Sequence, residues 1–367
     1  MKQTLRDFLC PQPKSKIKAG DGQLKGAYNF YTSSQIQSKF YHSATYTQPA
    51  LIFGTGGMAS VHYCNEPFST STDCLVMYGR LGAPLELIYY YLRSNMHLLQ
   101  DGFKGAGLQH ISKDYILNIN INMPAPSLQE QITHQMRLID AMINGKKQQI
   151  LSFDEAVKSR FIELFGDPVS NPKDWDVVPL GKRCGIITGN TPSRSEPENY
   201  GEYIEWIKSD NINTPFTFIT KAQECLSEAG FDKCRFVEAG SILMTCIAGS
   251  INCIGNVAVT DRRVAFNQQI NAIVPEQDEV LYLYWLMQLS KPMIHRTINM
   301  ALKGILSKSQ LSEIAFPFPP ITLQEQFATF VEQTDKSKYY SSLSFRYCQA
   351  AANTYRQEWM TCRTSDF

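Results

Sequence analysis

Two long stretches of the chain repeat hydrophobic residues at helical spacing. From Leu128 to Phe165, apolar side chains recur at intervals of three, four or seven, which places them on one face of a helix. If this helix is continuous, its roughly 38 residues span about 57 Å. A second stretch, from Leu323 onward, has a similar but more polar stripe. The stripe residues are Ile132, Met136, Ile139, Ile143, Ile150, Phe153 and Val157 in the first helix, and Phe327, Val331 and Phe345 in the second.

An apolar stripe of this length is unstable in water, so each helix needs a surface to cover it. The simplest solution is that the two helices pack against each other. The alternative is that each helix covers its own neighbouring domain, as most amphipathic helices do.

Short hydrophobic runs separated by turn residues precede each helix, and this pattern is typical of β-strands. Residues 50–63 predict a strand, a glycine-rich turn and a returning strand, and residues 241–259 repeat this plan. One further short strand is expected in each region, through Phe68 and Leu75 in the first and through Phe266 and Ile273 in the second.

The chain contains an internal repeat at an offset of 195 residues. The segment 124–131 matches the segment 319–326, and Ile111 to Lys113 match Leu306 to Lys308. In both copies prolines interrupt regular structure, and a hydroxyl residue with a glutamate three positions later then predicts a capping box. These boxes are Ser127 with Glu130 and Thr322 with Glu325. Two long helices are therefore expected to begin at equivalent places.

The repeat predicts an α+β protein with two mostly-β domains in tandem, each followed by a long helix. The predicted boundaries are 1–124 for the first domain, 125–171 for the first spacer helix, 172–321 for the second domain and 322–367 for the second spacer helix.

Composition excludes several protein classes. The 367 residues, 43% hydrophobic and 19% charged, are typical of a globular protein and not of a disordered or fibrous one. No apolar run reaches the ~20 residues of a membrane span, and the amino terminus lacks a signal-peptide pattern, so we expect a cytoplasmic protein without a membrane partner. The 10 cysteines form no Cys-x-x-Cys pair and the 6 histidines lack ligand spacing, so we expect no metal.

The net charge of +1 favours no partner by itself, but polar and basic residues gather beside the predicted loops. Lysine and arginine suit phosphates and guanine edges, and asparagine or glutamine can pair with adenine. The candidate DNA contacts are Lys14, Lys16, Lys18 and Lys104 in the first domain, and Thr191, Ser193, Arg194, Lys208, Asn211 and Gln268 in the second. For any one of them, ordinary solvated surface is an alternative.

Residues Gly54 to Ala59 fit a dinucleotide fingerprint, with Asp73 at the distance of a ribose ligand. The residues that follow are not helical in pattern, so this loop lacks the helix amino terminus that would face a pyrophosphate. No phosphate-binding Gly-rich loop with Lys, nucleophile elbow or base-methylation motif is present. We therefore expect no catalytic residue in this chain.

Taken together, the duplicated proline passages with Leu128 to Gln131 and Leu323 to Gln326, the run Phe165 to Trp175 and the loop Gly189 to Ser193 resemble the specificity subunit of a type I restriction-modification system. The resemblance covers essentially the whole chain. It implies two target-recognition domains that read the halves of a split double-stranded DNA sequence, and two helices paired as an antiparallel coiled coil.

The resemblance also implies partners. Two DNA methyltransferase subunits would dock on the helices and restriction subunits would join them. S-adenosylmethionine, ATP and magnesium would belong to those partners, so that this chain is non-catalytic and holds no cofactor. Two alternatives remain open at this point: a pseudosymmetric scaffold that binds only proteins, and a nucleotide-dependent enzyme that uses Gly54 to Ala59.

Overall fold

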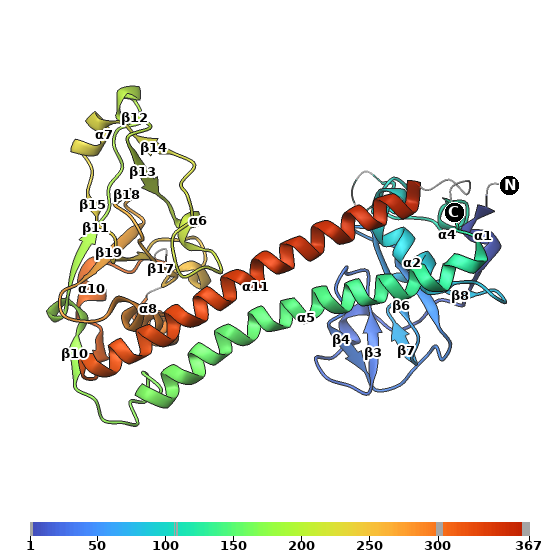
Figure 1. Ribbon diagram of the computed structural model, residues 1–367, viewed down its shortest axis with the longest axis horizontal. Coiled ribbons are helices and arrows are strands. Elements are labelled where there is room, and N and C mark those ends of the chain that lie inside the picture. Colours follow the sequence, from blue (N-terminus) through green and yellow to red (C-terminus); the bar gives the residue numbers. More distant parts are fainter. Residues whose placement is uncertain (1–2, 106, 108, 299–303, 362–367) are drawn as a thin grey trace. The chain divides into compact units, whose positions relative to one another are not determined.

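The computed structural model describes residues 3–105, 107, 109–298 and 304–361, with side chains as far as Tyr355. The described chain divides into two compact units. One contains the residues up to 148 together with those from 342 on, and the other contains residues 149–341. Each unit holds one β-rich domain and part of both long helices (Figure 1).

The first domain is built on a four-stranded antiparallel sheet of order β2-β8-β5-β6. A second sheet, β4-β3-β7, pairs β3 with β7 in parallel, and β1 pairs with β9. The elements are β1 Gln3–Thr4, α1 Leu5–Phe8, β2 Leu9–Pro11, β3 Tyr28–Tyr31, β4 Lys39–Tyr41, β5 Ala50–Gly54, β6 Ser60–Cys64, β7 Phe68–Thr70, β8 Cys74–Gly79, α2 Leu85–Ser94, α3 Met96–Gln100, α4 Lys113–Leu117 and β9 Asn120–Ile121.

The second domain repeats this plan with additions. Its four-stranded sheet has the order β11-β19-β16-β17, and its other sheet, β12-β14-β13-β18-β15, has five strands with β13 parallel to β18. The elements are β10 Val177–Pro179, β11 Cys184–Thr188, β12 Tyr200–Gly201, β13 Ile204–Ile207, α6 Ser209–Ile212, β14 Cys225–Leu226, α7 Glu228–Asp232, β15 Phe236–Val237, β16 Ile242–Thr245, β17 Val257–Val259, β18 Val264–Phe266, β19 Ile270–Pro275, α8 Val280–Leu289, α9 Lys291–Arg296, α10 Lys308–Glu313 and β20 Ala315–Pro317.

The structure confirms the repeat. Helices α2 and α8, helices α4 and α10, and strands β9 and β20 begin 195 positions apart. The expectation of one further strand per domain was wrong, because the chain turns between Phe68 and Leu75 and between Phe266 and Ile273. Each run forms two strands that belong to different sheets, β7 and β8 in the first domain and β18 and β19 in the second.

The glycine-rich loop after β5 connects two antiparallel strands. Strands β5 and β6 pair from Ala50 opposite Cys64 to Gly54 opposite Ser60, and no helix follows the loop. A side chain at Gly54 would collide with Ser60, so this glycine allows the strands to approach closely. The strand-to-helix turn that a dinucleotide site needs is therefore absent at this loop.

The two long helices are α5 Pro126–Phe165 and α11 Ile321–Thr361. They run antiparallel: Gln135 bonds Tyr355 in one unit, and Asp154 pairs with Lys338 in the other. Helix α5 continues through Gly145 without a break. Every predicted stripe residue is shielded: Met136, Val157, Phe327 and Val331 are buried, and Ile132, Ile139, Ile143, Ile150, Phe153 and Phe345 are half-buried.

Both helices begin two residues earlier than the capping boxes predicted. Pro126 is the first residue of α5, where its fixed φ and missing N–H cost nothing, so Ser127 lies inside the first turn. Instead of the hydroxyl, a repeated glutamine ties the helix to the segment before it. The Gln129 side-chain amide donates to the carbonyl of Pro124 at 3.0 Å, and Gln324 donates to that of Pro319 at 2.9 Å.

Helix α5 ends as its Gly and Pro residues predicted. Gly166 has a φ of 80°, a left-handed conformation that glycine adopts without strain and that stops the helix. Trp175 then returns to the helix end, and its indole N–H donates to the carbonyl of Phe165 at 2.9 Å.

The two units hold their helices with different contacts. In the second unit, Phe161 and Phe165 of α5, Tyr282 of α8 and Phe327 of α11 form an aromatic cluster with ring centroids 4.8 to 5.6 Å apart. In the first unit, helix α2 is tied to α5 by two ion pairs. Arg137 donates to Glu86 at 2.7 Å, and Arg93 donates to Asp140 at 2.5 Å.

Candidate nucleic-acid interface

Three of the predicted lysines of the first domain lie on one extended segment. Lys14, Lys16 and Lys18 are exposed and alternate with buried Ser15 and half-buried Ile17. The segment is held to β8 and its preceding turn, because Gln12 N–H donates to Val76 at 2.8 Å and Thr72 N–H donates to Ile17 at 2.9 Å. Alternation along an extended backbone therefore points all three lysines to the same side.

Lys104 belongs to a loop at the same end of the four-stranded sheet. It pairs with His110, which pairs in turn with Gly56 of the glycine-rich loop. The N–H of Thr55 donates to Asp73, in the turn that precedes β8. The lysine segment and the Lys104 loop are thus connected through neighbouring loops. Among the described residues, no ion pair involves Lys14, Lys16, Lys18 or Lys104.

In the second domain, the loop after β11 lies against the turn between β18 and β19. The N–H of Gly189 donates to Ile270 at 3.0 Å, and that of Asn190 donates to Phe266 at 3.1 Å. This close approach leaves no room for a side chain at Gly189. It brings Thr191 and Gln268 together, and the Thr191 hydroxyl donates to the Gln268 amide oxygen.

Arg194 and Lys208 meet at one carboxylate. The guanidinium of Arg194 donates to both oxygens of Glu224, at 2.5 and 3.1 Å, and the Lys208 ammonium donates to the second oxygen. The Arg194 guanidinium lies 4.6 Å from the ring centroid of Tyr200 and 5.4 Å from that of Trp206. Lys208 lies 5.1 Å from the Trp206 ring. We call Arg194, Tyr200, Trp206, Lys208 and Glu224 the Glu224 cluster.

The charges in the Glu224 cluster stabilise one another. The hydrogen bond from Arg194 lowers the pKa of Glu224, with Lys208 acting in the same direction and partial burial opposing both. The bond with Glu224 correspondingly raises the pKa of Arg194. Glu224 and Arg194 therefore stay ionised at neutral pH, and the cluster contains two basic side chains and one carboxylate.

Two predicted residues have other surroundings. Asn211 is buried: its side-chain oxygen accepts from the N–H of Lys208 at 3.1 Å, and its amide donates to the carbonyl of Lys221 at 3.1 Å. These bonds give Asn211 a role in holding α6, so it is not positioned to read a base. Ser193 is exposed, and its hydroxyl lies 2.7 Å from that of Ser195 in the same loop.

Sequence reasoning missed Glu224 and the aromatic residues of its cluster. Glu224 is close to Trp206 because the adjacent strands pair Glu205 with Cys225, a long-range register that no local pattern announces. The only local signal was Trp206 two positions before Lys208, which on a strand places both side chains on one face.

Among the described residues, no cluster of three or more His, Cys, Asp or Glu side chains could hold a metal ion. Within the same residues, no helix is both long and apolar enough to span a bilayer. The nine described cysteines are free thiols, and four of them are buried.

Comparisons with known proteins identify the family. A family model described as the type I restriction modification DNA specificity domain matches residues 3–152 and again residues 172–339. The chain is 35% identical over 117 residues to the HindI specificity subunit of a type I restriction enzyme from Haemophilus influenzae, covering 30% of this chain and 24% of the relative. It is 30% identical over 176 residues to the MjaIX specificity subunit from Methanocaldococcus jannaschii, covering 45% and 38%. These alignments span less than half of either relative.

The fold is also found in a solved structure. It is the S subunit of a type I restriction-modification system from M. genitalium. The match covers 99% of this chain and 96% of the S subunit, with a TM-score of 0.65 and 14% identity. At that identity the likeness shows the fold alone. Because the family model matches both halves of the sequence, this chain belongs to the family of type I restriction-modification specificity subunits.

Proposed function

We propose that this chain reads a bipartite DNA sequence, with one half-site contacted by each domain, and that it is itself non-catalytic. The observation that carries the proposal is the duplication of one sheet plan, in which each domain places polar and basic side chains on loops at one end of its four-stranded sheet. In the first domain these are the Lys14 to Lys18 segment and the Lys104 loop. In the second they are the loops of Thr191, Arg194 and Gln268.

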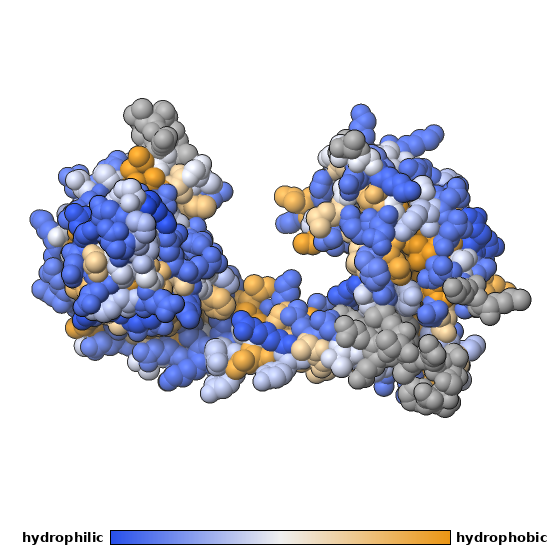
Figure 2. Space-filling model, turned by 90° about the horizontal axis from the view of Figure 1, so that it is seen from above, coloured by the Kyte–Doolittle hydropathy of each residue, from blue (hydrophilic) through white to orange (hydrophobic). Residues whose placement is uncertain are grey.

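The long helices support the second part of the proposal, that the chain docks two methyltransferase subunits and fixes the spacing of the half-sites. Forty residues of α5, at 1.5 Å each, give a rod of roughly 60 Å, or about 18 base pairs. In the space-filling view, hydrophobic side chains are exposed on the domains and also on the segment that joins them (Figure 2). Leu138, Met142 and Leu151 of α5 are each at least half exposed, which fits a surface that a partner covers.

Catalysis and cofactors are assigned to the partners. The proposal places S-adenosylmethionine on the methyltransferase subunits, and ATP and magnesium on restriction subunits that join the complex. The protein-only scaffold is less well supported, because it gives no reason for unpaired lysines on the first domain or for the Glu224 cluster on the second.

A domain exchange tests the proposal. Residues 1–124 are replaced by the corresponding domain of another family member, and methylation sites are mapped in cells that express the chain with its methyltransferase subunits. We expect one half-site to change, with the other half-site and the spacing retained. An unchanged methylated sequence would refute DNA reading by the first domain. The reciprocal exchange of residues 172–321 is the matched control, and it should change only the other half-site.

A further inference from the structure

The arginine of the Glu224 cluster has its recognition face occupied. Arg194 uses both terminal nitrogens for the two oxygens of Glu224, which is the parallel, two-bond geometry that arginine also uses for a phosphate or a guanine edge. The side chain is 58% exposed, so it is accessible to solvent, but its fork is already filled. The Lys208 ammonium is likewise directed at Glu224.

A main-chain hydrogen bond and two aromatic rings hold the cluster in place. The main-chain N–H of Trp206 donates to the carbonyl of Glu224 at 3.1 Å, which fixes the carboxylate beside the indole. The Arg194 guanidinium lies over the rings of Tyr200 and Trp206, and the Lys208 ammonium lies over the ring of Trp206. The Glu224 side chain is 26% exposed and the Lys208 side chain 36%, so the cluster lies at the surface and within reach of a nucleic acid.

An occupied cation contributes little to binding of a DNA backbone. When a free lysine or arginine neutralises a phosphate, it releases a condensed counterion, and this release drives sequence-independent binding. When Arg194 leaves Glu224 for a phosphate, one ion pair replaces another, and a negative carboxylate, still paired with Lys208, is left beside the DNA. The first domain differs, because Lys14, Lys16 and Lys18 take part in no ion pair within the described residues.

We propose that Glu224 masks Arg194 and Lys208 from the DNA backbone, so that the second domain binds unrelated sequences weakly and uses these two cations only where a specific site displaces the carboxylate. This inference rests on the proposed function and adds a residue that controls how tightly the protein binds DNA without its recognition sequence. Glu224 acts through Arg194 and Lys208 and touches no DNA in its masking state.

The test is the variant Glu224→Gln in the full chain assembled with its methyltransferase subunits. Binding to a duplex that lacks the recognition sequence is measured by fluorescence anisotropy over a series of salt concentrations. Uncovering one positive charge should tighten this binding roughly tenfold near 0.1 M salt, and should steepen the slope of log K against log salt by about 0.9. In the Glu224→Gln background, Arg194→Ala should reverse most of the gain, whereas in the wild-type background it should change binding to this duplex little.

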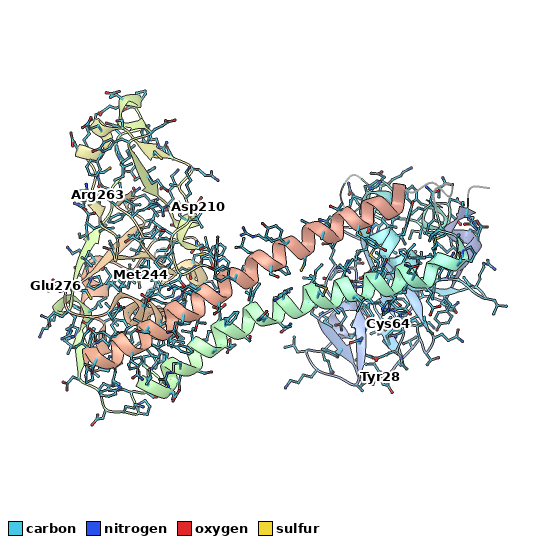
Figure 3. The ribbon with its side chains drawn as sticks, viewed as in Figure 1. Tyr28, Cys64, Asp210, Met244, Arg263 and Glu276 are labelled. Carbon is cyan, nitrogen blue, oxygen red and sulfur yellow. The ribbon has the colours of Figure 1, made fainter. Side chains whose placement is uncertain are left out.

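Glu238→Gln is the matched control. Glu238 pairs with Arg263 in the same domain, at 2.7 Å, so this variant removes the same charge from a similar ion pair. Figure 3 labels Arg263 and Asp210 at separate places in this domain. Asp210 belongs to α6 and follows Lys208 by two residues. An equal gain from Glu238→Gln would show that overall charge is responsible, and weaker binding by Glu224→Gln would show that the carboxylate supports DNA contact. Either result overturns the proposal.

Two further measurements keep the outcome decisive. If Glu224→Gln lowers the thermal midpoint, Glu224→Asp is used instead. This variant retains the charge, but its side chain is too short to bond both fork nitrogens and Lys208. We expect a smaller gain in binding to the unrelated duplex, and no gain would refute masking. Methylation mapping of the wild type is done alongside. If no bipartite site emerges, the proposed function fails; if a site emerges and Glu224→Gln binds the unrelated duplex as the wild type does, only the masking proposal fails.

Discussion

The two domains share one sheet plan but hold their long helices by different chemistry. In the second unit the contact between α8 and the helix pair is aromatic and buried, built on Tyr282, Phe161 and Phe327. In the first unit, α2 and α5 are joined by the pairs Glu86 with Arg137 and Arg93 with Asp140, both partly exposed. The comparison teaches that duplication preserves topology and register, while the contacts that hold α5 differ between the copies: aromatic burial joins it to α8, and ion pairs join it to α2.

The largest difference is expected from removing equivalent apolar side chains. Phe327 and Ile132 occupy the same position of the repeat, but Phe327 is fully buried and Ile132 is half-buried. Phe327→Ala should cost about 3 to 5 kcal/mol of local stability, and Ile132→Ala about 1 to 2 kcal/mol. Hydrogen exchange of α8 and α2 amides measures the two effects separately. Equal losses would contradict the view that the second unit depends more on aromatic burial.

A smaller effect is expected at the junction between domain and helix. In the second unit Asp278 has a fully buried side chain, accepts two bonds from Arg183 at 2.6 and 2.8 Å, and accepts a third from Gln324 at 2.8 Å. Asp278→Ala should cost about 3 kcal/mol, because it leaves Arg183 without its partner. The exposed pair of the first unit is the control, and Arg137→Gln should cost at most about 1 kcal/mol. Similar thermal midpoints for the two variants would show that burial of the junction does not matter.

The smallest effect is a change in thermal midpoint that we expect to have opposite signs in the two copies of the repeat. Asp140 and Asp335 are equivalent in the repeat, but Asp140 pairs with Arg93, whereas Asp335 is half-buried and accepts from the Thr217 hydroxyl at 3.1 Å. Burial raises the pKa of Asp335, with nearby Lys338 opposing the shift. A raised carboxyl pKa means that the protonated form stabilises the fold at low pH, and that this stabilisation is lost as the pH rises through the folded pKa.

Asp335→Asn should therefore raise the thermal midpoint slightly at pH 7, and the difference from the wild type should shrink as the pH falls. Asp140→Asn should lower the midpoint, by about 1 kcal/mol in free energy, because it weakens a charged pair. Thermal unfolding of both variants between pH 4 and pH 8, a range of about four units above the ordinary Asp pKa, gives the comparison. A fall of the midpoint for Asp335→Asn at pH 7 would contradict the sign derived from burial.

The architecture could be predicted from the sequence because the repeat is long and periodic. The offset of 195 located α2 and α8 and the starts of both long helices to within two residues, and the glycines of residues 54–57 located the hairpin of β5 and β6. The capping boxes failed because Pro126 fits the first helical position better than any hydroxyl fits the cap, and Gln129 reaches the segment before it instead.

The candidate interface was less predictable. Asn211 has the polar side chain of a base-reading residue, but the short helix α6 uses it as an internal bond. Glu224 lies 30 positions after Arg194 and 16 after Lys208. The pairing of β13 with β14 brings Glu224 to the end of β13 beside Lys208, and Arg194 reaches it from the loop after β11. Contacts made across strands in this way depend on the tertiary fold, and their partners share no local pattern.

The parallel strands β3 with β7 and β13 with β18 also affect how each domain is made. These pairings join residues far apart in the chain, Asn29 with Phe68 and Trp206 with Ala265. Neither pair can form until the later strand has been synthesised. Closing such distances costs chain entropy before any contact repays it, whereas the β5 and β6 hairpin closes locally. During synthesis on the ribosome, the hairpin of each domain is therefore expected to form first, and the second sheet to complete last.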